Sequence, residues 1–415
     1  MPRVSDRPLT LLRAAWVAPI CAPVLRDGAI LFSGDRIVAV GSEKDLAREH
    51  AGASPEDYGD AIILPGLVNA HCHLELSHLT PPPNVKSFVD WLAAVMAPSS
   101  QPASVGDSVR AGIEESLRFG VTLVGDISKE PQTARAVLSE SALAAVSYGE
   151  VVGMAGRRHL FAPRLTAALD ASFTGPRLRT GVSPHAPYSV DRHGYRACID
   201  AARSSDIPIT THVAETPDEA SFLKRHAGPF RRLWERLGAW TDPPEREMND
   251  PVEFVASVPL LNFPLTLLAH VNYCSNSDLG TLRRGVASVV FCPRTHAYFG
   301  HPPHRWRDML ARQVNVCVGT DSRASSPDLN LVDDLRLMHR EAPEVTPATL
   351  WEMATIRGAR ALGMERGWGT LAAGKDADCV VFPATTDDPL REILDRPVLP
   401  LAVWADGRKV FTAAR

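Results

Sequence analysis

The stretch that most constrains this chain is residues 64–78, which read Leu-Pro-Gly-Leu-Val-Asn-Ala-His-Cys-His-Leu-Glu-Leu-Ser-His. An apolar run stops at the Pro-Gly pair, a strong turn signal, and residues 67–73 then read as a short strand. Side chains on a strand alternate between its two faces, so His71 and His73 point the same way. Two neutral imidazoles side by side make half of a metal site. Two ordinary polar residues near a sheet edge are the alternative, because the pattern is short.

The middle of the chain alternates apolar strand patterns with helical ones. Eight such strands interleaved with helices are typical of a (β/α)8 barrel of the TIM type. Active-site residues of these barrels lie at the carboxyl ends of the strands, and the informative polar residues of this chain fall there. The predicted strands are 67–73, 121–127, 144–150, 178–185, 208–213, 265–271, 287–292 and 315–321, with helical patterns such as 109–119, 192–202, 277–284 and 305–312 between them.

Both ends of the chain differ from the middle, because they read as β structure. Residues 28–41 are two apolar runs joined by Ser-Gly-Asp, and residues 402–411 form a similar pattern about Asp-Gly, and both patterns predict hairpins. We therefore expect an α/β fold with two domains. A small β-sandwich domain is built from both termini, residues 1–62 and 369–415, and residues 63–368 form the barrel.

Composition narrows the class of protein. The chain has 415 residues, 45% hydrophobic and 22% charged, and a net charge of −4, which gives no electrostatic support for nucleic-acid binding. No apolar run approaches the ~20 residues of a membrane helix. Seven scattered cysteines with no Cys-x-x-Cys pair argue against a disulfide framework. We expect a cytoplasmic protein whose partner is a small-molecule substrate.

Chemically active residues converge at the predicted strand ends. Three imidazoles and a carboxylate suit a divalent metal, which lowers the pKa of bound water from near 16 to about 7. Glu215 can carry protons between that water and a substrate, while His270 and Asp321 can orient and deprotonate the water. Each residue also has a structural alternative: His270 could be a buried structural histidine, Asp321 a helix cap, and Glu215 a carboxylate at the start of a helix. The convergent set is His71, His73, His212, Glu215, His270 and Asp321.

These motifs resemble the amidohydrolase superfamily, in its deaminase and chlorohydrolase branch, along nearly the whole chain. The resemblance implies the barrel and the β domain described above. It also implies one divalent metal, zinc or iron, held by His71, His73, His212 and Asp321, with Glu215 as proton shuttle. The matching pieces are residues 65–73, 212–215, His270, 319–322, 354–363 and 369–378.

One absence refines the resemblance. The binuclear hydrolases of this superfamily use a carboxylated lysine at the end of strand four. Here that strand ends in Ser-Pro-His-Ala-Pro-Tyr, with no lysine, and Lys129 follows strand two instead. The mononuclear deaminase type is favoured.

The substrate is less constrained by the sequence. His185 resembles the substrate-contacting histidine of nucleoside deaminases, with a structural histidine in a Pro-rich turn as the alternative. Arg294 follows strand seven and suits a planar anion through two parallel hydrogen bonds, so a substrate carboxylate is expected there, with a surface salt bridge as an equal alternative.

The loop after the first barrel strand resembles aminodeoxyfutalosine deaminases of menaquinone biosynthesis. The likeness rests on Glu75 and on a downstream Phe-x-x-Trp-Leu at Phe88 and Trp91. Their substrate is an adenine nucleoside that carries a benzoate, which would suit Arg294. The two aromatic residues could stack on a ring, or form the apolar face of a helix. We count Glu75, with His185 and Arg294, as a candidate substrate-binding residue.

The sequence therefore predicts a metal-dependent hydrolytic deaminase of an aminated purine nucleoside, first of all 6-aminodeoxyfutalosine. Alternatives are 5'-methylthioadenosine or S-adenosylhomocysteine, guanine, or a chlorohydrolase substrate. A catalytically inactive assembly protein on the same fold is the rival outside enzymes. Family resemblance suggests a homodimer. Residues 216–264 are longer than one helix requires. Residues 222–240 have a helical pattern and 241–247 read as a polar loop, and the whole segment is either a lid or a simple insertion.

Overall fold

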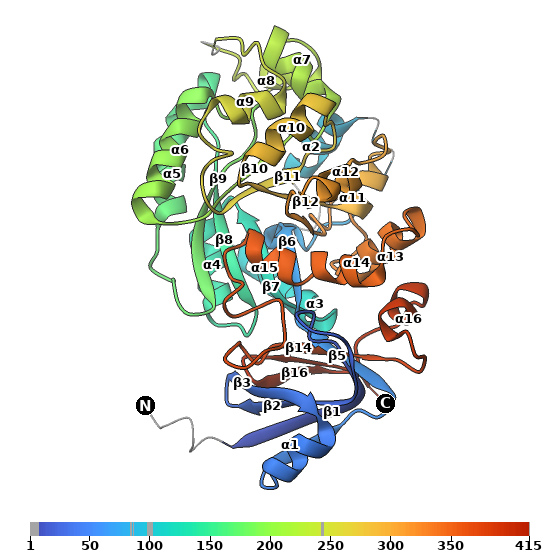
Figure 1. The fold of residues 1–415 in the computed structure, drawn as a ribbon. Coiled ribbons are helices and arrows are strands. Elements are labelled where there is room, and N and C mark those ends of the chain that lie inside the picture. The colour runs from blue at the N-terminus through green and yellow to red at the C-terminus, as the bar shows by residue number, and fades with distance from the viewer. Residues whose placement is uncertain (1–7, 84, 86, 98–102, 242–244, 415) are drawn as a thin grey trace.

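A parallel sheet of eight strands is the centre of the molecule (Figure 1). The computed structural model describes residues 8–83, 85, 87–97, 103–241 and 245–414. The strands follow one another in chain order, and the sheet closes where the N–H of Asp321 donates to the carbonyl of His71 at 3.0 Å. The predicted TIM-type barrel is confirmed. Its strands are β6 (Leu67–Cys72), β7 (Val121–Ser128), β8 (Ala144–Val151), β9 (Leu178–Pro184), β10 (Ile209–Val213), β11 (Thr266–His270), β12 (Ser288–Phe291) and β13 (Val316–Val318).

Side chains of alternate strand residues fill the inside of the barrel. On β8, Ala144, Val146 and Tyr148 belong to one buried cluster with residues of β6, β7, β11 and β12. The period of two follows from the pleat of the strand, so the next residue in this series, Glu150, also faces the barrel axis. The interior is therefore apolar below and polar at its carboxyl end.

Helices cover the outside of the barrel (Figure 1). Several begin at a polar side chain that accepts an otherwise unpaired backbone N–H: Ser104 accepts from Asp107 at 3.0 Å, and Asp191 accepts from Gly194 at 2.9 Å. These caps fix where each helix starts. The covering helices are α3 (Val105–Arg118), α4 (Pro131–Ser139), α5 (Phe161–Leu169), α6 (Arg192–Ser205), α10 (Asn276–Arg284), α12 (Trp306–Ala311), α13 (Leu331–Glu341), α14 (Pro347–Met353) and α15 (Ile356–Ala361).

The two chain ends form a second, separate sheet, as predicted. Its order is β16-β15-β14-β5-β1-β2-β3, with β4 paired to β1, and the predicted hairpins join β2 to β3 and β15 to β16. Arg177 connects this sheet to the barrel through Asp378, at 2.8 Å. The elements are β1 (Leu9–Val17), β2 (Leu25–Ser33), β3 (Arg36–Ser42), α1 (Glu43–Glu49), β4 (Ser54–Asp57), β5 (Ala61–Pro65), β14 (Cys379–Pro383), α16 (Pro389–Asp395), β15 (Ala402–Ala405) and β16 (Arg408–Thr412).

Three short helices follow β10: α7 (Pro217–Arg225), α8 (Pro229–Arg236) and α9 (Pro251–Ser257). The helical pattern over residues 222–240 predicted a continuous helix, and this is wrong. His226 adopts a left-handed backbone with φ 49°, and Gly228, with φ 88°, precedes Pro229. A left-handed residue ends the helix, and a proline starts the next one without losing a hydrogen bond.

The remaining helices lie near the carboxyl end of the barrel. They are α2 (Phe88–Met96) and α11 (Pro293–Tyr298), together with 3-10 turns at Leu74–Leu76 and Ala155–Leu160. In the described part of the chain, no helix combines the length and the apolar character that crossing a membrane demands.

Substitution of Arg135, on α4, tests how the helices are held to the barrel. Its side chain is 1% exposed, and its guanidinium donates to backbone carbonyls of β8, β9 and the α5 region. We expect Arg135→Met to leave these carbonyls without a donor and to lower the free energy of unfolding by about 3 kcal/mol. Urea unfolding measures this. Arg110→Met, an exposed arginine on α3, is the control and should change stability by less than ~0.5 kcal/mol. Equal effects would contradict the anchoring role.

Candidate metal centre and active site

Five side chains from four strand ends meet at the carboxyl end of the barrel. Asp321 Oδ1 lies 3.6 Å from His71 Nε2 and 3.6 Å from His73 Nε2. The ring of His212 lies 5.0 Å from the ring of His71 between centroids, and that of His270 lies 5.2 Å from it. Nitrogen and oxygen atoms of two triads each fall within 4.8 Å of one another: His71, His73 and His212, and His71, His270 and Asp321. The convergence predicted for these residues is therefore present.

The chemistry of this group of donors fits a divalent metal. All five side chains are buried. Burial lowers the pKa of His212 to about 3 and holds the pKa of His73 and His270 well below its usual value, so these imidazoles are neutral and carry a free lone pair. Both ring nitrogens of His71 and the Nε2 of His270 are buried without a hydrogen-bond partner in the described part of the chain. Buried polar atoms of this kind are rare unless something binds them.

Neighbouring groups orient the ligands. The carbonyl of His185 accepts from His212 Nδ1 at 3.0 Å, which leaves the Nε2 lone pair of His212 for the centre. Ser325 Oγ donates to Asp321 Oδ2 at 3.0 Å. His270 and Asp321 themselves have left-handed backbones, with φ 70° and φ 58°. Left-handed backbones at non-glycine residues are uncommon and concentrate at functional sites.

Glu215 lies beside the centre, with Oε1 3.4 Å from His270 Nε2. Burial, and then the negative charges of Asp321 and Glu219, raise the pKa of Glu215 well above its usual value. Its backbone is held on both sides, because its N–H donates to Glu219 Oε2 at 3.1 Å and its carbonyl accepts from Asn272 Nδ2 at 3.0 Å. A fixed carboxyl group whose pKa is raised holds its proton more strongly than a free glutamic acid, which suits general acid catalysis.

An apolar cover lies over the metal centre. Trp91 Nε1 donates to the carbonyl of Ala324 at 2.8 Å, and this bond fixes α2 across the barrel mouth. Phe88 packs against Tyr188 and Phe230, so α8 also contributes to the cover. The cavity beside the metal centre has a volume of about 50 Å³, which is smaller than a nucleoside. The cavity is lined by His73, Leu76, Phe88, Trp91, Leu92, Val95, Lys129, Glu150, His185, Tyr188, His212, Glu215, Asp321 and Ser322.

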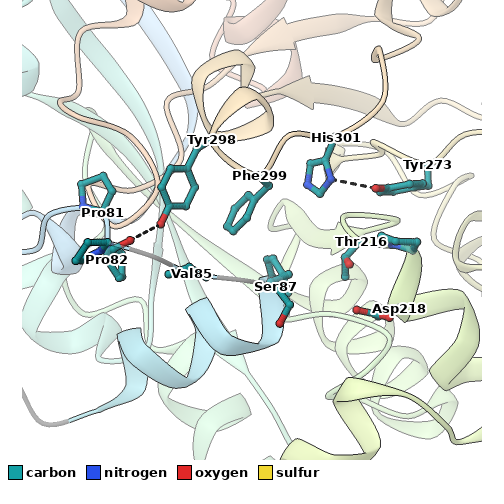
Figure 2. Close-up of a pocket in the computed structure, with 13 residues that line it drawn as sticks. Pro81, Pro82, Val85, Ser87, Thr216, Asp218, Tyr273, Tyr298, Phe299 and His301 are labelled. Atoms are coloured by element: carbon teal, nitrogen blue, oxygen red, sulfur yellow. Dashed lines mark hydrogen bonds between the residues drawn. The ribbon is translucent and has the colours of Figure 1, made fainter.

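A second, wider pocket has a volume of about 520 Å³, and Figure 2 shows residues that line it. Phe88 lines both spaces. The Tyr298 hydroxyl donates to the carbonyl of Pro82 at 2.9 Å. The hydroxyl oxygen of Tyr273 lies 3.1 Å from His301 Nδ1. Aromatic side chains thus separate the metal centre from this outer surface.

The structure places the three predicted substrate-binding residues differently. His185 lines the cavity, with Nδ1 2.7 Å from Ser189 Oγ. Glu75 is buried away from it, because its Oε2 accepts from Ser128 Oγ at 2.8 Å and from the N–H of Lys129 at 3.0 Å. It ties the loop after β6 to the end of β7.

Arg294 is not brought to the centre. Its Nε donates to Asp334 at 2.9 Å, Nη1 donates to Asp328 at 2.6 Å, and Nη2 donates to the carbonyls of Asp328 and Asn330. Its side chain is 12% exposed, and Asp334 is fully buried. The expected carboxylate site at Arg294 is therefore not supported, because protein acceptors occupy the guanidinium.

Two charged cavity residues, Lys129 and Glu150, were missed as substrate candidates. A signal for Glu150 was available, since the alternation along β8 points it inward at the carboxyl end of the strand. Lys129 comes directly after β7, which is also a strand end. Both positions follow the rule that identified the metal ligands.

Comparison with known proteins agrees with this site. The model of the Amidohydrolase family matches residues 62–410. The 5-methylthioadenosine/S-adenosylhomocysteine deaminase of Moorella thermoacetica is 28% identical over 89% of this chain and 85% of that protein. The aminodeoxyfutalosine deaminase of Deinococcus radiodurans is 28% identical over 81% of both chains. An adenosine deaminase from Xanthomonas campestris with bound zinc has a TM-score of 0.80 at 25% identity, over 98% of this chain and 94% of that one.

Metal content distinguishes ligands from other cavity residues. We expect His71→Ala to remove two buried donor atoms and to lower the metal bound per chain at least ~10-fold after dialysis, measured by inductively coupled plasma mass spectrometry. His185→Ala is the matched control, because it removes an imidazole from the same cavity but keeps the backbone carbonyl that orients His212. Loss of metal in His185→Ala, or full metal in His71→Ala, would contradict the ligand assignment.

Proposed function

Because this chain belongs to the amidohydrolase family, we propose that it removes the amino group of an adenine nucleoside by hydrolysis. The chain is a hydrolase of carbon–nitrogen bonds other than peptide bonds. One observation supports the proposed reaction most: Glu215, a buried carboxyl with a raised pKa, lies 3.4 Å from His270 at the edge of the histidine cluster. Relatives that share most of the chain are named as deaminases of such nucleosides.

We assign the centre one divalent metal, zinc first and iron as the alternative, with His71, His73, His212 and Asp321 as its ligands. A bound divalent ion lowers the pKa of water toward 7 and so supplies hydroxide at neutral pH. The burial of the ligands excludes bulk water from the centre. Electrostatic interactions in such a site are stronger than in water.

The protein side chains move the protons of the reaction. Glu215 gives its proton to the ring nitrogen beside the carbon that carries the amino group. Asp321 and His270 orient the water whose oxygen replaces the amino nitrogen on that carbon. Of the two protons that this water loses, one passes through Glu215 to the departing amine and the other restores the Glu215 carboxyl. The amino group leaves as ammonia, one hydrogen remains on the ring nitrogen, and the water oxygen becomes the new carbonyl.

Glu215→Gln tests this proton path. We expect kcat to fall by about 100- to 10,000-fold, because the amide cannot exchange a proton with substrate. Bound metal and the melting temperature should stay unchanged, since the amide keeps the size of the carboxyl. Glu235→Gln, on the exposed side of α8, is the control and should keep full activity. Normal ammonia release by Glu215→Gln would refute the mechanism.

The position of Lys129 indicates which chemical group the nucleoside substrate carries. Lys129 lines the cavity with an exposed side chain that interacts electrostatically with Glu75. In contrast to Arg294, it forms no salt bridge with another described residue. An unpaired ammonium favours an adenine nucleoside with an acidic group. The first candidate is 6-aminodeoxyfutalosine, whose benzoate would pair with Lys129 and would place the reaction in menaquinone biosynthesis. S-adenosylhomocysteine also carries a carboxylate, whereas 5'-methylthioadenosine carries none.

Lys129→Ala separates these substrates. We expect kcat/KM for 6-aminodeoxyfutalosine to fall about 10- to 100-fold through loss of a charge-assisted hydrogen bond. The value for 5'-methylthioadenosine should change less than about 2-fold. Lys44→Ala, an exposed lysine of α1, is the control. Equal losses on both nucleosides would remove Lys129 from substrate recognition. A wild-type preference for the methylthio compound would make that compound the substrate.

A further inference from the structure

Glu150 is a carboxylate placed inside the barrel mouth. It is the last inward-facing residue of β8, above Tyr148, and it is 4% exposed. It lines the same cavity as Glu215 and Asp321. Neither the metal centre nor the proton path described above uses it.

No described residue donates a hydrogen bond to the Glu150 carboxylate. Arg164 forms an ion pair with it, with Nη1 4.0 Å from Oε1, and the neutral imidazole of His185 has its Nε2 3.9 Å from Oε2; both distances are too long for a hydrogen bond. A buried carboxylate without hydrogen-bond donors is costly, because it has lost its hydration and gained little in return. The arrangement is stable when donors from a bound ligand complete it.

The metal centre and Glu150 lie on either side of one cavity residue, His185. The imidazole of His185 lies between the two, with its ring centroid 5.1 Å from that of His212 and its Nε2 3.9 Å from Glu150. A purine whose amino carbon is at the centre would pack along His185. Its sugar would then reach the part of the cavity that Glu150 lines.

We propose that Glu150 binds the sugar of the substrate by accepting hydrogen bonds from two neighbouring hydroxyl groups. Carboxylates recognise ribose hydroxyls in this way in other nucleotide sites. The substrate is then a ribonucleoside rather than a free base such as guanine or a triazine. This assignment rests on the proposed deaminase function and narrows its substrate class.

The test compares adenosine with 2',3'-dideoxyadenosine. We expect the wild-type enzyme to prefer adenosine in kcat/KM by about 10- to 100-fold, because only adenosine offers both hydroxyls. Glu150→Gln should lower kcat/KM for adenosine by a similar factor and leave the dideoxy compound within about 2-fold. Glu140→Gln, an exposed residue before the start of β8, should change neither value.

A binding measurement gives a second readout that does not depend on turnover. By calorimetry, the wild-type protein should bind inosine at least ~10-fold more tightly than 2',3'-dideoxyinosine, and Glu150→Gln should lose that difference. If Glu150→Gln weakened the binding of inosine and of 2',3'-dideoxyinosine equally, the assignment of Glu150 to the sugar would be overturned. The deaminase function would stand, and Glu150 would have a structural role. If the variant does not fold, equal binding of the two inosines by the wild-type protein would overturn it. No turnover of adenosine, 6-aminodeoxyfutalosine, S-adenosylhomocysteine or 5'-methylthioadenosine by the wild type would overturn the deaminase function and this assignment together.

Discussion

The site depends on one seam, where the first and last barrel strands meet. The N–H of Asp321 donates to the carbonyl of His71, and below it Asn69 and Thr320 exchange two buried hydrogen bonds, at 2.7 and 3.1 Å. Gly319 permits this approach, because a Cβ at that position would lie 2.7 Å from the carbonyl oxygen of His71. Ligands some 250 residues apart in the sequence therefore share one centre only when the barrel closes.

Burial then gives the centre its chemistry. Removing water keeps the imidazoles neutral, so they can donate lone pairs, and raises the pKa of the Glu215 carboxyl, which favours its acid form. The same cover that excludes water, built on Phe88 and Trp91, leaves room for only about 50 Å³ beside the ligands. Catalysis and substrate entry thus make opposite demands on α2. A short helix held by one tryptophan hydrogen bond and by aromatic packing can meet both.

Much of this arrangement could be predicted from the sequence. His71, His73, His212 and Asp321 were predictable because parallel strands in a barrel bring all their carboxyl ends to one face. The strand period also places His71 and His73 on one side. The segment after β10 was harder, since the helical period over residues 222–240 continues through the left-handed turn at His226. Periodicity detects an apolar face, but it does not detect a local change of backbone direction.

Charged residues show where sequence reasoning ends and contacts become necessary. Arg294 and Lys129 both follow barrel strands, and the sequence favours the arginine because its geometry suits a carboxylate. In the structure, Asp328 and Asp334 already hold Arg294, whereas the exposed Lys129 ammonium forms no salt bridge with another described residue. A buried charge whose donors are satisfied by the protein stabilises the fold and would lose energy by turning to a ligand. A charge at the cavity without such partners can bind a ligand at little cost, and for this reason Lys129 and Glu150, rather than Arg294, are assigned to the substrate.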